Sequence, residues 1–169
     1  MNKIVESYKR KLATEEGWVL KRGAQLRIAL CYPNTYAIGM ANLGFQAMYE
    51  LFNNIPEVSC ERVFLPDSSR SHKGSSGYDA LPHGRPSDTI NELSEYERTR
   101  TPLLSLESQT AVRDFDVIAF SISFETDYVN MARMLQMSGV PVWAKDRTKH
   151  DPLIVMGGAS SFLNPEPIA

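Results

Sequence analysis

Short runs of apolar residues constrain the fold of this chain most strongly. The clearest runs are residues 26–32, 116–123 and 153–156, and residues 58–65 form a fourth, more polar candidate strand. A strand that is apolar throughout needs cover on both faces, as in a parallel sheet packed between helices. The runs also alternate with segments of helical periodicity. We therefore predict an α/β fold with a flavodoxin- or Rossmann-like parallel sheet and helices on both faces.

Two segments between the strands show the spacing of amphipathic helices. Residues 42–54 begin at Asn42 and end before Pro56, and residues 128–138 end at Gly139. The expected apolar faces are Phe45, Met48, Tyr49, Phe52 and Ile55 in the first helix, and Val129, Ala132, Met134 and Leu135 in the second. These helices supply the connections that parallel strands require.

The chain divides into three parts. Residues 1–25 read as an N-terminal helical extension, with a charged helix over 2–16. Residues 26–169 form the α/β domain. Within it, residues 67–101 are rich in Ser, Gly, His, Arg and Pro, which predicts a flexible insertion with a short helix over 87–96 capped by Ser87.

Composition and charge exclude several classes of protein. The chain has 169 residues and a formal net charge of −2, so nothing favours nucleic acid or an anionic membrane as a partner. No apolar run approaches the ~20 residues that span a bilayer, and the charged N-terminus lacks a signal-peptide core. We therefore expect a cytoplasmic protein with no membrane partner.

The two cysteines, Cys31 and Cys60, lie in strand-like segments and are expected to be buried free thiols. A four-iron cluster takes four ligands, usually with at least three cysteines, so this chain alone does not hold one. The three histidines, His72, His83 and His150, lie in expected loops and read as solvated surface. We assign no catalytic residue and no metal ligand.

A ligand in an open parallel sheet binds beyond the carboxyl ends of the strands, where the strand order reverses. For the flavodoxin-like order this point lies between strands 26–32 and 116–123. The loops at that edge supply the candidate cofactor-binding residues, which are Asn34, Thr35, Tyr36, Gly39, Ser121, Ser123, Glu125, Gly157, Gly158 and Ala159. Their hydroxyls and small side chains suit a large neutral or amphipathic ligand. Each of them also has an ordinary structural role, in turns or in local hydrogen bonds, so only their joint placement favours a site.

Five segments together resemble the N-terminal cobalamin (vitamin B12)-binding-type domain of radical S-adenosylmethionine (SAM) proteins. The segments are residues 27–44, 61–66, 103–108, 115–130 and 152–167. The resemblance implies a corrinoid whose nucleotide tail passes Ser121 and Ser123 and threads beside Gly157 and Gly158. Cobalamin domains commonly carry a histidine where this chain has Tyr36, so we expect no protein histidine on cobalt.

The resemblance also implies a partner. In this family a barrel domain carries the [4Fe-4S] cluster and binds SAM, and this chain has no such barrel, so we expect a radical SAM barrel domain or subunit as partner. The last edge strand of the sheet is also expected to be missing from this chain. We therefore expect a cobalamin-binding module that is not catalytic alone but is part of a methyl- or group-transferring enzyme.

Two other functions stay open. One is a degenerate, non-catalytic docking domain of the same family, suggested by Tyr36 and by the long insertion. The other is a flavodoxin-like binder of flavin or nucleotide, although no Gly-x-Gly-x-x-Gly or phosphate-loop lysine supports it. A hydrolase is disfavoured because Gly-x-Ser-x-Gly is absent.

Overall fold

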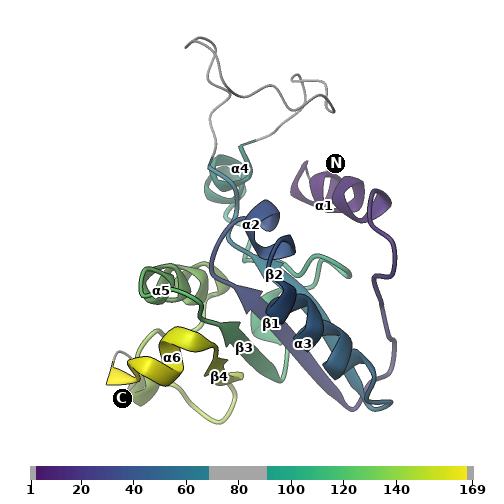
Figure 1. Cartoon of the computed structure of the whole chain (residues 1–169). Helices are drawn as coiled ribbons and strands as arrows, with labels where there is room; N and C mark the ends of the chain where they lie inside the picture. The colour runs from purple at the N-terminus through teal and green to yellow at the C-terminus, as the bar shows by residue number, and fades with distance from the viewer. Residues whose placement is uncertain (1–2, 69–90, 167–169) are drawn as a thin grey trace, which may run out of the picture.

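The chain folds around a parallel four-stranded sheet. The computed structural model describes residues 3–68 and 91–166, and its strand order is β2-β1-β3-β4. The strands are β1 (Leu26–Tyr32), β2 (Val58–Phe64), β3 (Val117–Ser121) and β4 (Leu153–Gly157). All three strand pairs are parallel. The predicted α/β class is confirmed (Figure 1).

Six α-helices and two 3-10 turns connect and flank the strands in the described part of the chain. They are α1 (Lys3–Ala13), α2 (Tyr36–Met40), α3 (Leu43–Asn53), α4 (Glu92–Thr99), η1 (Val112–Asp114), α5 (Asp127–Ser138), η2 (Ala144–Asp146) and α6 (Ala159–Leu163). The connection through α3 runs from β1 to β2, toward one edge of the sheet. The connection through α5 runs from β3 to β4, toward the opposite edge. Because parallel crossovers are right-handed, α3 and α5 cover opposite faces of the sheet.

The core is concentrated around β1 and β2. Every residue of β2 is buried, including its polar ones. Tyr32 and Phe45 pack edge to face with ring centroids 5.3 Å apart, and Phe45 and Phe64 pack with tilted rings 5.5 Å apart, between β1, α3 and β2. Each such ring removes enough apolar surface from water to contribute about 2 kcal/mol. The central strands are therefore the stable part of the domain.

Arg62 of β2 is a buried charge with carboxylate partners. Its side chain is 2% exposed, and its Nε lies 2.6 Å from Oε1 of Glu107. Its Nη1 lies 2.7 Å from Glu15, and the guanidinium stacks on the Tyr49 ring at 4.7 Å. Burial raises the pKa of Glu107 to about 7, although Arg62 opposes that shift. Through Arg62, these ion pairs join β2 to the segment before β1, which carries Glu15, and to the segment before β3, which carries Glu107.

The N-terminal helix packs on α4. The hydroxyls of Tyr8 and Tyr96 lie 3.0 Å apart in a buried contact, and Lys11 pairs with Glu92 at 2.6 Å. Asn91 caps α4 by accepting a hydrogen bond from the backbone N–H of Ser94. The helix predicted over 87–96 therefore begins later, at Glu92, and the proposed cap Ser87 falls outside the described residues, as do His72 and His83.

Two sequence predictions about burial are wrong. Val129 was expected to face inward from its helix but is 75% exposed, and Met131 takes the inward position. The last strand was expected to be fully buried, yet Leu153 is 62% exposed and Val155 is 40% exposed. The reason is that β4 lies at the edge of the described sheet, and α3 reaches only part of the face that these two side chains share.

The burial of two further residues also differs from the prediction. Met48 and Ile55 were expected on the inner face of their helix, but both are partly exposed, at 38% and 43%.

Cys31 and Cys60 are buried free thiols, as predicted. Among the described helices, none has the length and apolarity needed to cross a membrane.

Candidate functional site

A cavity of about 710 Å³ lies between α3 and the sheet and reaches the carboxyl ends of β3 and β4. Its lining residues are Leu30, Asn42, Gly44, Ala47, Met48, Phe52, Ala119, Phe120, Ser121, Ser123, Val155, Met156, Gly157, Gly158 and Ala159. The strands and α3 supply apolar walls, and the strand ends supply small and polar groups. Apolar walls with a few polar groups are typical of a small-molecule site.

Two adjacent glycines shape the rim in opposite ways. A Cβ on Gly157 would meet no atom within 4 Å, so this position is open. Gly158 has φ +116°, and a Cβ there would collide with the backbone of Ile122, lying 2.9 Å from its carbonyl carbon. Gly158 is therefore required for the close approach of two loops, whereas Gly157 leaves room at the cavity.

Hydrogen bonds hold the loops after β3 and β4 together. The backbone N–H of Ile122 donates to the carbonyl oxygen of Gly157 at 2.7 Å. The hydroxyl of Ser160 donates to the carbonyl oxygen of Ser123 at 3.0 Å. The rim of the cavity is thus fixed by backbone contacts rather than by long side chains, which favours a preformed site.

Asp127 fixes the loop that follows β3. The side chain is 1% exposed, and its Oδ2 accepts hydrogen bonds from the backbone N–H groups of Ser123 and Phe124, at 2.9 Å and 2.8 Å. This carboxylate lies in the first turn of α5, where a negative charge interacts favourably with the positive end of the helix dipole. This role of Asp127 was not predicted from the sequence.

Asn42 joins the three elements around the cavity. Its Oδ1 accepts from the backbone N–H of Phe45 at 2.9 Å and so caps α3. Its Nδ2 lies 3.3 Å from the Tyr32 hydroxyl and 3.4 Å from the Ser123 hydroxyl. Ser121, by contrast, has no hydrogen-bond partner for its hydroxyl in the described part of the chain. A free hydroxyl at an apolar cavity is available to a ligand.

The predicted first loop does not line this cavity. The Tyr36 hydroxyl donates to Glu15 at 2.6 Å, and its ring packs edge-on against Phe64. Burial, followed by the bond to Glu15, raises the pKa of Tyr36. Gly39 is buried in α2, where a Cβ would collide with the same Phe64 ring. These residues pack the end of β2 instead.

The other members of that group also lie away from the cavity lining. Asn34 accepts a hydrogen bond from the backbone N–H of Thr35 at 2.8 Å, which closes a local turn. Thr35 precedes α2 without a side-chain cap. Glu125 is exposed on the loop before α5. The structure thus brings together five of the ten candidates, namely Ser121, Ser123, Gly157, Gly158 and Ala159.

The wall that α3 contributes to the cavity was not predicted from the sequence. Gly44 and Ala47 lie three residues apart, and Met48 and Phe52 lie four apart, so helical spacing places each pair on one side. That spacing was visible in the sequence, but Met48 and Phe52 were assigned to the core. Small residues at Gly44 and Ala47 were the available signal that this side of the helix borders space.

The fold and cavity define a class: a parallel α/β domain whose carboxyl edge holds a ligand-sized apolar cavity. Residues 87–169 match the family model described as "Radical SAM proteins, N-terminal". This segment, slightly under half of the chain, is similar to the N-terminal domain of radical SAM proteins. The match includes β3, α5 and β4, and therefore the serine and glycine positions at the cavity rim.

Two further comparisons gave no match. Neither the curated proteins nor the solved structures include one with significant similarity to the chain. The family description names radical SAM proteins and no corrinoid. Among the described residues, no group of three or more His, Cys, Asp or Glu could hold a metal ion.

Proposed function

We propose that this chain is the cobalamin-binding module of a radical SAM enzyme and that the cavity beside α3 receives the nucleotide tail of the corrinoid. The observation that carries the proposal is the cavity itself. Its volume is about 710 Å³, it is apolar inside, and it lies at the switch point between β1 and β3.

The residues at the rim fit a flat, amphipathic group. Open space at Gly157 lets a ring lie against the backbone. The Ser121 hydroxyl can donate or accept, and Asn42 and Ser123 add polar groups beside it. The cavity lining contains no charged side chain, which suits a largely neutral tail better than a bare triphosphate.

This chain offers no axial ligand to cobalt in the proposed arrangement. Tyr36 stands at the position of the histidine, but its hydroxyl is bonded to Glu15 and its ring packs on Phe64. When bound, cobalamin would supply a cobalt centre that carries a methyl or other group. The role of this chain is then to bind and orient the corrinoid and to exclude water from its tail.

The iron–sulfur cluster and SAM would come from a radical SAM barrel, as a domain or a separate subunit. Large apolar side chains beside the cavity supply a surface for that partner. Leu153 on β4 is 62% exposed, and Phe162 and Leu163 on α6 are 88% and 80% exposed. Apolar side chains gathered in this way commonly mark an interaction surface.

The same surface supports a second candidate function. A domain that only docks onto the barrel needs exposed apolar residues at β4 and α6 but no ligand. The flavodoxin-like alternative, a flavin or nucleotide binder, shares the strand order but gains no phosphate-binding residue from the cavity lining.

Binding of hydroxocobalamin separates these functions. The chain is mixed with hydroxocobalamin, passed through gel filtration, and scanned for corrinoid absorbance in the protein peak. Gly157→Leu fills the open side of the cavity without a backbone collision and should abolish retention. Ala144→Leu adds the same side chain at an exposed position in η2 and serves as the matched control.

Retention by the unmodified chain and by the control, but not by Gly157→Leu, supports the cobalamin proposal. No retained corrinoid in the unmodified chain contradicts it. Co-elution with a radical SAM barrel protein in the absence of any ligand then favours the docking function. Saturable quenching of flavin fluorescence would instead favour the flavodoxin-like alternative.

A further inference from the structure

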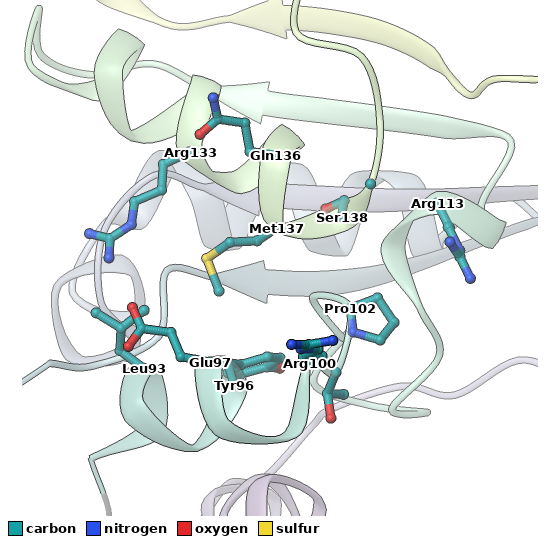
Figure 2. Close-up of a pocket in the computed structure, with 12 residues that line it drawn as sticks. Leu93, Tyr96, Glu97, Arg100, Pro102, Arg113, Arg133, Gln136, Met137 and Ser138 are labelled. Atoms are coloured by element: carbon teal, nitrogen blue, oxygen red, sulfur yellow. The ribbon is translucent and has the colours of Figure 1, made fainter.

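A second pocket, of about 480 Å³, lies between α4 and α5. Its lining residues are Leu93, Tyr96, Glu97, Arg100, Thr101, Pro102, Arg113, Arg133, Gln136, Met137, Ser138 and Gly139. Figure 2 shows α4 on one side and α5 on the other, with arginines from separate elements around the space between them. This pocket has no part in the proposed corrinoid site.

Positive charge dominates the pocket. Arg100 ends α4, Arg113 belongs to η1 and Arg133 belongs to α5, and all three are exposed. The lining includes one acidic residue, Glu97. The three arginines and one glutamate give the pocket a positive net charge, whereas the formal net charge of the whole chain is −2. A concave surface concentrates such a field.

The guanidinium groups have few partners within the protein. In the described part of the chain, Arg100 and Arg133 form no ion pair and no side-chain hydrogen bond. Arg113 has a single long contact, 4.0 Å from its Nε to Asp114. Other arginines use their donors locally: Arg147, for example, donates to two backbone carbonyl oxygens at 2.9 Å and 2.7 Å.

These arginines are not needed to cap α5. The carbonyl oxygen of Gln136 accepts from the backbone N–H of Gly139 at 3.1 Å, and that of Met137 accepts from Leu103 at 3.0 Å. These two carbonyl groups of the last turn are therefore satisfied by backbone donors. An arginine near a helix C-terminus commonly complements these carbonyls, so their satisfaction leaves the guanidinium groups available.

We propose that this pocket binds a small molecule carrying a diphosphate group. Guanidinium groups recognise phosphate oxygens with paired donors, and several separated cations suit more than one phosphate. In Figure 2, Arg133 lies toward one end of the pocket and Arg113 toward the other, with Arg100 between them. Leu93, Pro102 and Met137 provide apolar surface for an uncharged portion, such as a nucleoside.

The proposed anion site and the corrinoid site lie at opposite ends of α5. The loop before Asp127 borders the corrinoid cavity, whereas Gly139, after the last residue of the helix, borders the arginine pocket. A helix of twelve residues is about 18 Å long. The two sites therefore can be tested independently, and failure of one leaves the other standing.

Isothermal titration of the full chain with pyrophosphate and with adenosine diphosphate tests the proposal. The double variant Arg100→Ala, Arg133→Ala should weaken binding by roughly tenfold or more, because charged hydrogen bonds are lost. Arg22→Ala is the matched control, since it removes an exposed arginine that lines a different pocket. Thermal unfolding of each variant verifies that it is folded.

Tighter binding of adenosine diphosphate than of pyrophosphate supports a nucleotide, and equal binding supports the diphosphate group alone. In either case binding should weaken as salt is raised. No saturable heat with either compound at millimolar concentration would overturn the proposal. Binding that is unchanged in the double variant, or lost equally in the control, would also overturn it.

Discussion

The adjacent glycines after β4 allow a sharp test of how the cavity rim is built. Gly158→Ala should destabilise the domain strongly, and Gly157→Ala should not. The two substitutions add the same methyl group at neighbouring positions of one loop. The added group is identical, so any difference in the free energy of unfolding comes from the backbone conformation at each position and from the atoms around each Cβ.

The expected difference follows from the geometry. At Gly158, φ is +116°, a region that costs an L-residue about 1–3 kcal/mol. The added Cβ would also lie 2.9 Å from the carbonyl carbon and 3.0 Å from the nitrogen of Ile122. Relief requires Ile122 to move, which weakens its 2.7 Å hydrogen bond to Gly157, worth about 1 kcal/mol. The total is about 3 kcal/mol.

Gly157→Ala meets no atom within 4 Å. Its effect should lie within about 1 kcal/mol of zero, since the methyl group mainly restricts the unfolded chain. For a chain of this size, a loss of about 3 kcal/mol lowers the melting temperature by about 6–12 °C.

Urea denaturation followed by circular dichroism measures both variants against the unmodified chain. If the two variants unfold within about 0.5 kcal/mol of each other, the close approach of Gly158 to Ile122 does not exist in solution. The account of the cavity rim would then be wrong.

Three further predictions concern the same domain. Asp127→Ala removes the acceptor for the N–H groups of Ser123 and Phe124 and should cost about 2–4 kcal/mol in urea denaturation; a loss below about 1 kcal/mol would show that water replaces the carboxylate. Asn42→Ala removes the cap of α3 and should cost about 1 kcal/mol, whereas Asn42→Asp keeps an acceptor and should retain most of that stability. Burial raises the pKa of Glu107 from 4.5 to about 7, so the folded state holds this proton more tightly than the unfolded chain. The resulting stabilisation is complete below pH 4.5 and is lost as the pH rises through about 7; Glu107→Gln should flatten the dependence of stability on pH in that window, and an unchanged slope would refute the assignment.

Much of the architecture was predictable because the strand signals are local. Residues 26–32 and 116–123 are apolar and β-rich, and parallel strands with helical connections have few possible arrangements. The serine and glycine positions at the strand ends were predictable for the same reason. In a parallel sheet the residues that follow adjacent strands necessarily meet at one edge.

The failures have a common physical cause. Whether Val155 or Val129 is buried depends on what covers it, and this is a property of neighbouring elements rather than of the residue. Tyr36 was placed at the ligand edge by its spacing from β1, but its hydroxyl is bonded to Glu15, which lies twenty-one residues earlier. No local pattern signals a contact of that kind.

The sequence by itself determined the fold class, the direction of the strands and the edge at which the serine and glycine residues of β3 and β4 meet. These follow from periodicity and from chain connectivity, which act over short distances. Only the tertiary structure decided that α3 forms a wall of the cavity, that Gly157 faces open space while Gly158 touches Ile122, and that three arginines surround one pocket. Such features depend on the relative placement of elements, which is set by packing between residues far apart in the chain.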